Sequence, residues 1–285
     1  MNLKDKIRLG LAVFLIGVNA LVWQAVYARE GNRTLTVAFL SIGQGDGIFI
    51  EAPNGNQMMI DGGPGKIVLS ELGSVMPFFD HSIDLLLVTN PDKDHFGGFI
   101  DVLNRYKVTT VIEPGTHSDT GTYKEFEKDI QKENAERVIA KRGMDVELGG
   151  GVVFHIFFPD RDVLGLASNE GSIVGKLTYG KRSILFMGDS VQNVEKYIVQ
   201  IDGTALDSDI LKVGHHGSRT STSLELLQAS TPDIAVISSG KNNTYGHPHK
   251  ETLDNLAKNK IKMLNTADEG RLIFTTDGIG EWVKN

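Results

Sequence analysis

An acidic stretch directly after an apolar run constrains this chain more than any other part of its sequence. Residues 83–88 are mostly apolar and predict a buried strand. Asn90, Asp92, Asp94 and His95 follow within seven residues, and paired glycines then lead into a helical pattern. Carboxylates this close together repel one another, and a bound cation is the usual compensation. The alternative is a solvated turn whose aspartates cap the next helix.

Other ionisable side chains also come directly after predicted strands. They are Asp189 after residues 183–187, His215 and His216 after residues 209–213, and His247 in a polar loop after residues 234–238. Adjacent histidines flanked by glycines are poor core filler, so the pair His215-His216 indicates a functional site. The chain has no cysteine, and a metal site must therefore use His, Asp, Glu, Asn or backbone ligands.

Three motifs in one order carry a family resemblance. They are Asp92-x-Asp94-His95-Phe96-Gly97-Gly98, His215-His216-Gly217-Ser218 and Tyr245-Gly246-His247-Pro248. In this order they resemble the motifs of the metallo-β-lactamase superfamily, and the first is most similar to the hydrolase domain of ComEC-type competence proteins. Gly43-Gln44-Gly45-Asp46 resembles the same domain. One position departs from the superfamily signature, because Asn90 stands where a histidine is usual.

The order of predicted elements indicates the architecture. Strands at residues 35–40, 47–51 and 57–60 come first as hairpins, and later strands alternate with helices, twice over. This order predicts two sheets packed face to face with helices outside. It agrees with what the resemblance implies, an α/β fold with the αββα four-layer sandwich of the metallo-β-lactamase fold. We expect one domain over residues 34–285, with helices near residues 66–79 and 99–106 and a charged, exposed helix or insertion over residues 123–139.

The resemblance also implies a metal site. Its complete half would use Asp94, His95 and His215, with Asp189 as the shared carboxylate and Asp61 orienting the metal loop. The other half would retain Asn90 and Asp92, and residues 167–172 supply no histidine there. We therefore expect one tightly bound divalent metal and a weak second one. Zn²⁺ and Mn²⁺ are the candidates, because nitrogen ligands suit the first and oxygen ligands the second.

The N-terminal segment, residues 1–33, differs from the rest. Lys4, Lys6 and Arg8 precede an uncharged run over residues 9–28, which is long enough to cross a bilayer. The basic leader predicts a cytoplasmic N-terminus and an extracytoplasmic domain. We expect one uncleaved transmembrane helix as a membrane anchor. Cleavage after Ala28, which would release a secreted domain, is the alternative.

The predicted chemistry is hydrolysis, since a metal lowers the pKa of its bound water from about 15.7 toward 7. Asp94 and His247 are the predicted catalytic residues, and substrate contacts are expected from His216, Ser218, Asn243 and His247. The resemblance implies a phosphodiesterase or nuclease that acts on DNA or another phosphodiester outside the cytoplasm. Hydrolysis of a small ester, lactam or thioester and a non-catalytic binding domain are the alternatives.

The charge of the chain argues against nucleic acid as the substrate. The chain has 29 Lys and Arg against 36 Asp and Glu, and residues 1–28 hold three of the bases and one of the acids. The remainder therefore has a net charge of −9, whereas nucleic-acid binders usually carry a basic stripe.

Overall fold

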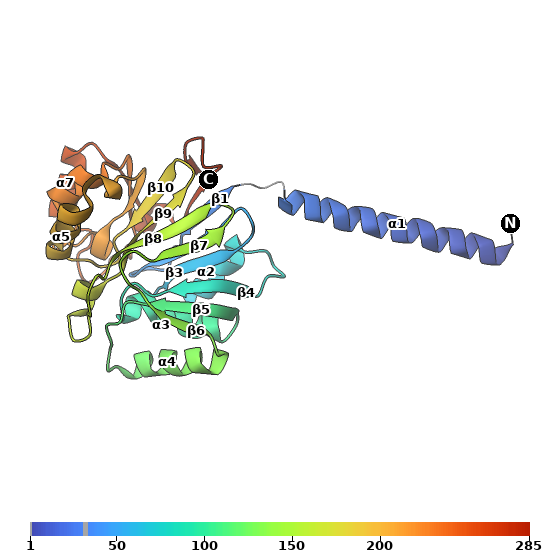
Figure 1. Cartoon of the computed structure of the whole chain (residues 1–285), viewed down its shortest axis with the longest axis horizontal. Coiled ribbons are helices and arrows are strands. Elements are labelled where there is room, and N and C mark those ends of the chain that lie inside the picture. The colour runs from blue at the N-terminus through green and yellow to red at the C-terminus, as the bar shows by residue number, and fades with distance from the viewer. Residues whose placement is uncertain (1, 31–33) are drawn as a thin grey trace.

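The structure is a computed structural model that describes residues 2–30 and 34–285. It consists of an N-terminal helix, α1 (Leu3–Glu30), and a domain of two sheets with helices on both outer faces (Figure 1). Asn54-Gly55 turns the chain between β2 and β3, as a hairpin signal of this kind predicts.

The first sheet has eight strands in the order β15-β14-β1-β2-β3-β4-β5-β6. Its strands are β1 (Leu35–Phe39), β2 (Gly47–Glu51), β3 (Gln57–Gly62), β4 (Ser82–Leu87), β5 (Lys107–Glu113), β6 (Glu136–Ile139), β14 (Leu272–Thr276) and β15 (Val283–Lys284). From β3 to β6 neighbouring strands are parallel, so their carboxyl ends meet at one edge.

The second sheet has seven strands in the order β13-β12-β11-β10-β9-β8-β7. Its strands are β7 (Asp145–Gly149), β8 (Val152–Phe158), β9 (Val174–Tyr179), β10 (Arg182–Phe186), β11 (Ile210–Lys212), β12 (Ile234–Ile237) and β13 (Lys262–Asn265). Strands β10 to β13 are parallel, and their carboxyl ends face the same side of the molecule as the ends of β3 and β4. Ligand sites in sheets of this kind lie at such ends.

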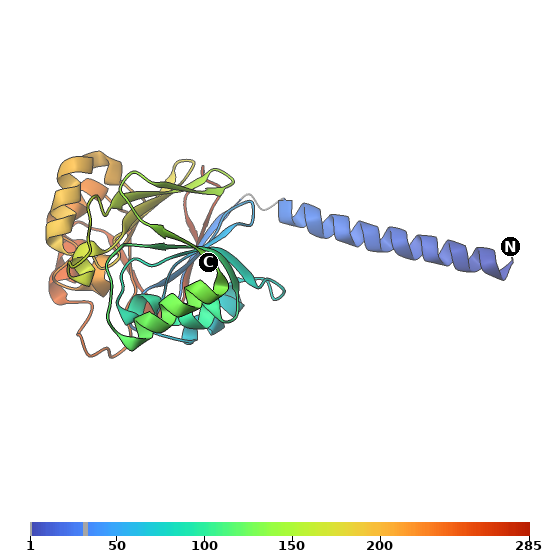
Figure 2. The same ribbon diagram turned by 60° about the horizontal axis from the view of Figure 1, so that its bottom comes forward.

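The layers follow from the period of two along each strand. On β1, Val37 and Phe39 join the core between the sheets, whereas Ala38 lies on the outer face. The helices are α2 (Ile67–Val75), α3 (Lys93–Leu103), α4 (Gly121–Glu133), α5 (Gln192–Asp202), α6 (Leu224–Ser230), α7 (Lys250–Lys258) and α8 (Thr266–Glu269), with short 3₁₀ turns at Ser168–Gly171, Gly203–Leu206 and Gly214–Gly217. Helices α2 to α4 cover the first sheet and α5 to α7 the second, as two views show (Figures 1 and 2).

The predicted four-layer αββα fold is confirmed, but two local predictions were wrong and one strand was missed. Residues 123–139 are not one exposed helix: α4 ends at Glu133, β6 follows, and Tyr123, Phe126 and Ile130 are buried. The strand β7 was not predicted, because polar residues alternate on its exposed face. Helix α3 begins at Lys93 and not near residue 99, so Asp94 and His95 lie in its first turn.

Of the α1 side chains that the structure describes, which are those up to Trp23, none belongs to the three hydrophobic clusters of the domain. Its stretch Leu3–Trp23 is long and apolar enough to cross a membrane. The domain boundary at residue 34 stays a prediction.

A truncation tests that boundary. We expect residues 29–285 to be soluble and to unfold at the same temperature as the full chain in detergent, because the described part of α1 makes no core contact. Circular dichroism against temperature measures this. Aggregated protein, or a midpoint several degrees lower, would show that the N-terminal segment belongs to the fold.

Candidate metal centre

His95 is held by a buried carboxylate at the end of β3. Its Nδ1–H donates to Asp61 Oδ2 at 2.8 Å, and the Thr89 backbone N–H and hydroxyl also donate to Asp61 at 2.8 and 2.6 Å. Asp61 adopts a left-handed backbone, with φ of 56°, that turns its side chain back under the loop after β4. Because Nδ1 is the donor, the Nε2 lone pair of His95 faces away from Asp61.

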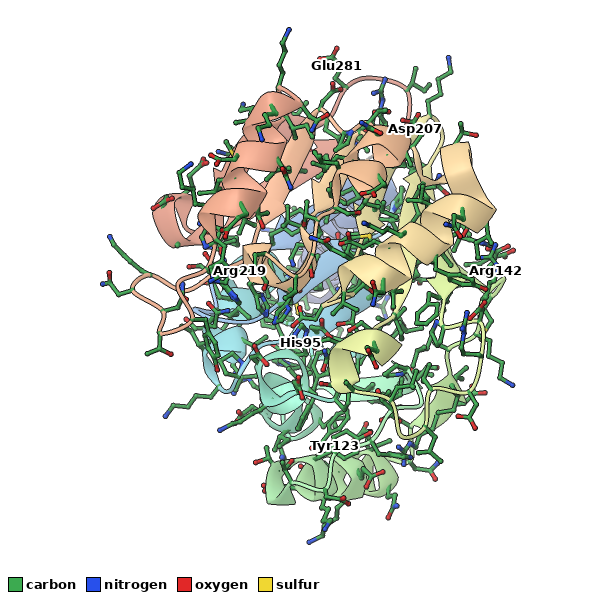
Figure 3. The ribbon with its side chains drawn as sticks, turned by 90° about the vertical axis from the view of Figure 1, so that its left-hand side faces the viewer. His95, Tyr123, Arg142, Asp207, Arg219 and Glu281 are labelled. Atoms are coloured by element: carbon green, nitrogen blue, oxygen red, sulfur yellow. The ribbon has the colours of Figure 1, made fainter. Side chains whose placement is uncertain are left out.

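Three further side chains, those of Asp94, Asp189 and His216, converge with His95 near that Nε2 atom. Asp94 and His95 come from α3, His216 from the turn after β11, and Asp189 from the loop after β10. His95 Nε2 lies 3.2 Å from Asp189 Oδ2, and His216 Nε2 lies 3.3 Å from Asp94 Oδ2 and 3.6 Å from Asp189 Oδ1. Figure 3 shows His95 near the middle of this face of the domain. The ligating atoms of Asp94, His95 and His216 lie within 4.8 Å of one another.

The free atoms of this cluster fit a cation. His95 Nε2, His216 Nε2 and Asp189 Oδ1 are buried and have no hydrogen-bond partner among the described residues. Bonds of about 2.0–2.1 Å place the ligands of a tetrahedral ion about 3.3–3.4 Å apart, which is close to the distances above. Buried polar atoms without partners are costly, and a divalent cation at their centre would satisfy all three. The fold thus presents buried His and Asp groups that are able to bind metal.

His216 has a carboxylate behind it in the same way as His95. Its Nδ1 lies 3.1 Å from the Ser238 carbonyl and 3.3 Å from Asp46 Oδ1. The other oxygen of Asp46 accepts from Lys212 Nζ at 2.7 Å, and both side chains of that ion pair are buried. Carboxylates of this kind fix the tautomer and orientation of ligating histidines.

Charges in this cluster are strongly coupled. Burial alone would raise the pKa of Asp189, but His95 and His216 hold it well below its usual range. Burial would lower the pKa of His216, yet Asp189 and Asp46 raise it to about 10. Burial also acts against ionised Asp46, and Lys212 and His216 bring its pKa down to about 2. The carboxylates are therefore ionised at neutral pH, as ligation of a metal requires, whereas His216 carries a proton that an incoming cation would displace.

The two adjacent histidines have different surroundings. Both adopt left-handed backbone, with φ of 48° for His215 and 54° for His216, so their side chains diverge. His216 is 1% exposed and lies in the cluster, whereas His215 is 25% exposed and its Nε2 is 3.7 Å from Asp189 Oδ2. The geometry favours His216 as the ligand, and the assignment of His215 from the sequence stays a prediction that the variants below test.

Asn90 takes part in a hydrogen-bond network where the superfamily has a histidine. Its amide N–H donates to Asn169 Oδ1 at 2.7 Å and to Ser172 Oγ at 3.3 Å, and its Oδ1 accepts from the Asp92 backbone N–H at 2.8 Å. Asp92 in turn accepts from the Ser168 hydroxyl at 2.8 Å. These amides hold each other, so the predicted roles of Asn90 and Asp92 as weak ligands remain untested.

Of the other predicted site residues, His247 lies at the cluster, whereas Ser218 and Asn243 do not line the cavity there. His247 lines a cavity of about 320 Å³ over the cluster, together with Gln44, Lys93 and Tyr245. Burial and the neighbouring His215 and His216 lower the pKa of His247 to about 4, so its ring is neutral.

Ser218 and Asn243 do not line that cavity. The Ser218 hydroxyl bonds to Thr220 Oγ1 at 3.0 Å, and the Asn243 amide donates to the carbonyls of Gly240 and His247. Both side chains are engaged in shaping their own loops, and their predicted role in binding substrate stays a prediction.

Two buried residues of the site were not assigned from the sequence. Asp46 lies in the glycine-rich loop whose resemblance was noticed without a role for its carboxylate. Lys212 gave a clearer signal, since it is the one charged residue within the apolar strand that precedes His215-His216. A lysine there is almost never fully buried unless it has a partner.

Glycines bring the backbone segments of the site into contact. A Cβ on Gly98 would lie 2.0 Å from the carbonyl oxygen of Gly62, and a Cβ on Gly45 would lie 2.2 Å from that of Asp94. The Asp46 backbone N–H donates to the same Asp94 carbonyl at 3.2 Å. Helix α3, the end of β3 and the loop before β2 are thus packed without space for a side chain.

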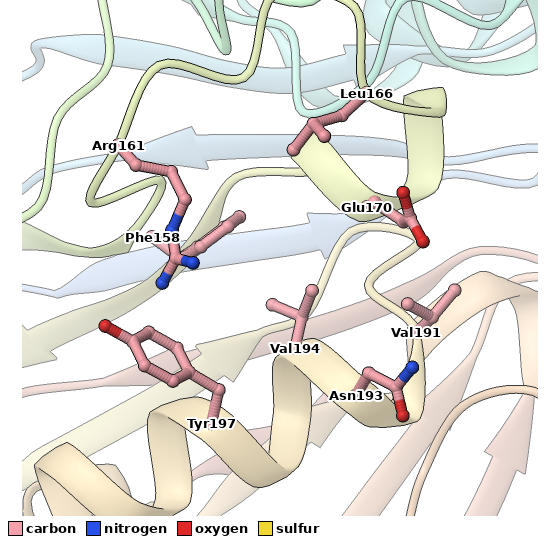
Figure 4. A pocket seen from close by; sticks show the side chains of 8 residues that line it. All are labelled: Phe158, Arg161, Leu166, Glu170, Val191, Asn193, Val194 and Tyr197. Carbon is pink, nitrogen blue, oxygen red and sulfur yellow. The ribbon is translucent and has the colours of Figure 1, made fainter.

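A second pocket, of about 250 Å³, is lined by residues that follow β8 and β10 in the chain (Figure 4). Glu170, next to Asn169, and Val191, two residues after Asp189, form one side. On the other side the Arg161 guanidinium stacks on the Tyr197 ring, 4.6 Å from its centroid.

Comparison with known proteins agrees with this geometry. A sequence profile of the Metallo-beta-lactamase superfamily matches residues 42–241, and the chain belongs to that family. The metallo-β-lactamase fold protein YhfI from Bacillus subtilis, at 12% identity, superimposes with a TM-score of 0.52 over 81% of this chain and 95% of its own. The chain thus has the metallo-β-lactamase fold, which is generally that of metal-dependent hydrolases.

Within that family the chain is related to ComEC-type competence proteins. It is 32% identical to ComE operon protein 3 of Bacillus subtilis and 31% identical to Recombination protein 2 of Haemophilus influenzae. These matches cover 84% and 87% of this chain but 32% and 29% of the relatives, so the chain spans about a third of their length.

Proposed function

We propose that this chain is a membrane-anchored hydrolase that cleaves phosphodiester bonds in DNA outside the cytoplasm. The proposal of a hydrolase rests on one observation. His95 Nε2, His216 Nε2 and Asp189 Oδ1 are buried without hydrogen-bond partners among the described residues and converge on one point. Asp94, His95, Asp189 and His216 would hold one Zn²⁺ or Mn²⁺ ion. When bound, such an ion supplies an activated water as nucleophile.

The protein's own groups supply the remaining functions. Asp61 and Asp46 orient the two histidines. Asp94 and Asp189 supply the negative charge that would balance a bound cation. His247, which is neutral and lines the cavity, would donate to or accept from a leaving oxygen. Its Nδ1 lies 3.5 Å from Gln44 Nε2.

Two features support DNA as the substrate. Lys93 lines the cavity and makes no ion pair with any described residue, so its ammonium is free for a phosphate. The second pocket offers the Tyr197 ring, the Arg161 guanidinium and the Asn193 amide, groups that stack on and hydrogen-bond to bases. The names of the relatives, a competence operon protein and a recombination protein, fit this substrate.

Orientation in the membrane follows from the N-terminal charges. Lys4, Lys6 and Arg8 precede the apolar stretch, and basic residues remain on the cytoplasmic side. We therefore assign the domain to the extracytoplasmic side.

Substrate screening tests the proposal. We expect full-length protein in detergent to cleave single- or double-stranded DNA when Mn²⁺ or Zn²⁺ is added, and to leave β-lactam, lactone and thioester substrates intact. Asp189→Ala should abolish cleavage, and Lys93→Ala should raise KM for DNA more than it lowers kcat, because a phosphate contact contributes mainly to binding.

The Asn90 network favours a second candidate, a DNA-binding domain without catalysis, since amides occupy the position of the usual first metal. Metal-dependent DNA binding without cleavage of any substrate would select it. Turnover of a small ester, lactam or thioester in place of DNA would contradict both candidates.

A further inference from the structure

The most exposed apolar side chains of the domain lie close to where the chain enters it. Of the large hydrophobic side chains described outside α1, the three most exposed are Phe79 at 88%, Phe78 at 84% and Ile279 at 74%. The two phenylalanines form a T-shaped pair with centroids 5.1 Å apart. The phenylalanine pair and Ile279 are two separate apolar groups, and strand register places both at one end of the domain.

Strand register places Ile279 at the entry of the domain. Leu35, the first residue of β1, pairs with Thr276, the last residue of β14. Ile279 is in the turn that follows, so it lies one strand spacing, about 5 Å, to one side of the line of β1. The Asp277 carboxylate holds this turn by accepting the backbone N–H groups of Ile279 and Gly280.

The same reasoning places Phe78 and Phe79 at this end on the other side of β1. The hairpin pairing of β1, β2 and β3 puts the start of β3 beside the start of β1, and β4 runs parallel to β3. The loop before β4, which carries both phenylalanines, therefore projects from the end at which β1 begins, three strands or about 14 Å away (Figures 1 and 2).

The length of the connecting segment limits how far this end of the domain can lie from the bilayer. Glu30 ends α1 and Leu35 begins β1, and this gap spans at most about 18 Å when fully extended. The apolar stretch ends at Trp23, and the seven remaining helical residues add about 10 Å. The entry of the domain is thus held within about 30 Å of the membrane, on the assumption of the proposed anchor.

Charged side chains of both signs also lie at this end of the domain. Lys107 opposes Ser82 at the start of β5, and the Lys181 backbone N–H donates to the Gly278 carbonyl, so two exposed lysines flank the apolar groups. Asp80, next to the phenylalanines, accepts from Gln57 and Ser82, and Glu281 is exposed. With Asp277 in the Ile279 turn, the acidic side chains named at this end outnumber the two lysines, so the contact would depend on apolar insertion.

We propose that Phe78, Phe79 and Ile279 enter the lipid–water interface and form a second membrane contact besides α1. This inference rests on the proposed anchor. Because the metal cluster lies at the carboxyl ends of β3, β4, β10 and β11, on the opposite end of the domain, the contact directs the catalytic cavity away from the bilayer.

Single-cysteine labelling tests the contact, and the natural absence of cysteine makes each label unique. Full-length Phe79→Cys and Ile279→Cys carry an environment-sensitive fluorophore in phosphatidylcholine–phosphatidylglycerol vesicles. The matched control is Thr244→Cys, an exposed site in the loop before His247 at the catalytic end. We expect a blue shift, quenching by lipid-borne nitroxide and protection from iodide at positions 79 and 279, and none of these at 244.

Two failures are distinguishable. Protein that does not float with the vesicles overturns the anchor and this contact with it. Protein that floats while the labels at 79 and 279 respond like the label at 244 overturns the contact alone and leaves the anchor in place. Protection that rises with protein density in the vesicles, at constant lipid composition, would assign the surface to a second copy and also overturn the lipid contact.

Discussion

Replacing His216 with alanine is expected to remove the metal, whereas replacing His215 is expected to retain it. His216 contributes a buried, bare Nε2 atom 3.3 Å from Asp94 and 3.6 Å from Asp189. Loss of a ligand should weaken Zn²⁺ or Mn²⁺ binding by at least the roughly 10–100-fold that loss of an outer partner costs. DNA cleavage should fall with it.

The measurement is metal content by mass spectrometry of purified protein, together with titration of the apo protein with each metal. His215→Ala is the matched control, since it removes the same side chain one position away, and circular dichroism shows whether either variant is unfolded. Metal loss in His215→Ala and retention in His216→Ala would establish the assignment made from the sequence and contradict the geometric one.

Lys212→Met is expected to cost about 3–5 kcal/mol of unfolding free energy, because it leaves the buried Asp46 carboxylate without its partner. The ion pair at 2.7 Å is almost fully buried on both sides. Lys262→Met on β13 of the same sheet is the control: Lys262 is exposed, and its replacement should change stability by less than about 0.5 kcal/mol. Urea unfolding measures both.

A double variant separates stability from positioning. Asp46→Asn with Lys212→Met removes both charges and should recover most of the lost stability. Metal affinity should stay about 10–100-fold lower, because the carboxylate that orients His216 is absent. Equal unfolding free energies for Lys212→Met and Lys262→Met would show that the buried pair contributes nothing, and unchanged metal affinity in the double variant would show that Asp46 does not position His216.

Much of the architecture could be predicted from the sequence because the strands carry strong local signals. Residues 47–51 were predicted with the bounds that β2 has, and the strand predicted at residues 234–238 ends one residue beyond β12, since the apolar runs stop close to turn residues. β7 gave no such signal, because its burial depends on pairing with β8 and not on its own composition. The start of α3 was missed because Asp92 and Asp94 fit a loop as well as a first helical turn.

The residues of the candidate site were harder to predict because the path of the backbone decides which side chains reach it. Nothing in the order of residues tells which of two adjacent histidines is buried. The turn after β11, in which both adopt left-handed dihedral angles, places His216 in the cluster and leaves His215 partly exposed. Likewise, Asp46 and Lys212 are 166 residues apart, and only the packing of one sheet on the other brings them together. Asp61 was identifiable because the resemblance gave its role, and the structure adds its contact with His95.

The glycine contacts described above have a consequence for mutational scanning of this chain. Gly98 and Gly45 are not among the predicted site residues, yet a side chain on either would collide with the carbonyl of Gly62 or Asp94. Such collisions would displace α3 and the Asp46 loop from each other, so substitutions at both glycines should score as severely as substitutions of the ligands. A deep mutational scan read by activity alone would therefore count them as catalytic, and pairing it with an abundance screen would separate residues that shape the site from those that act in it.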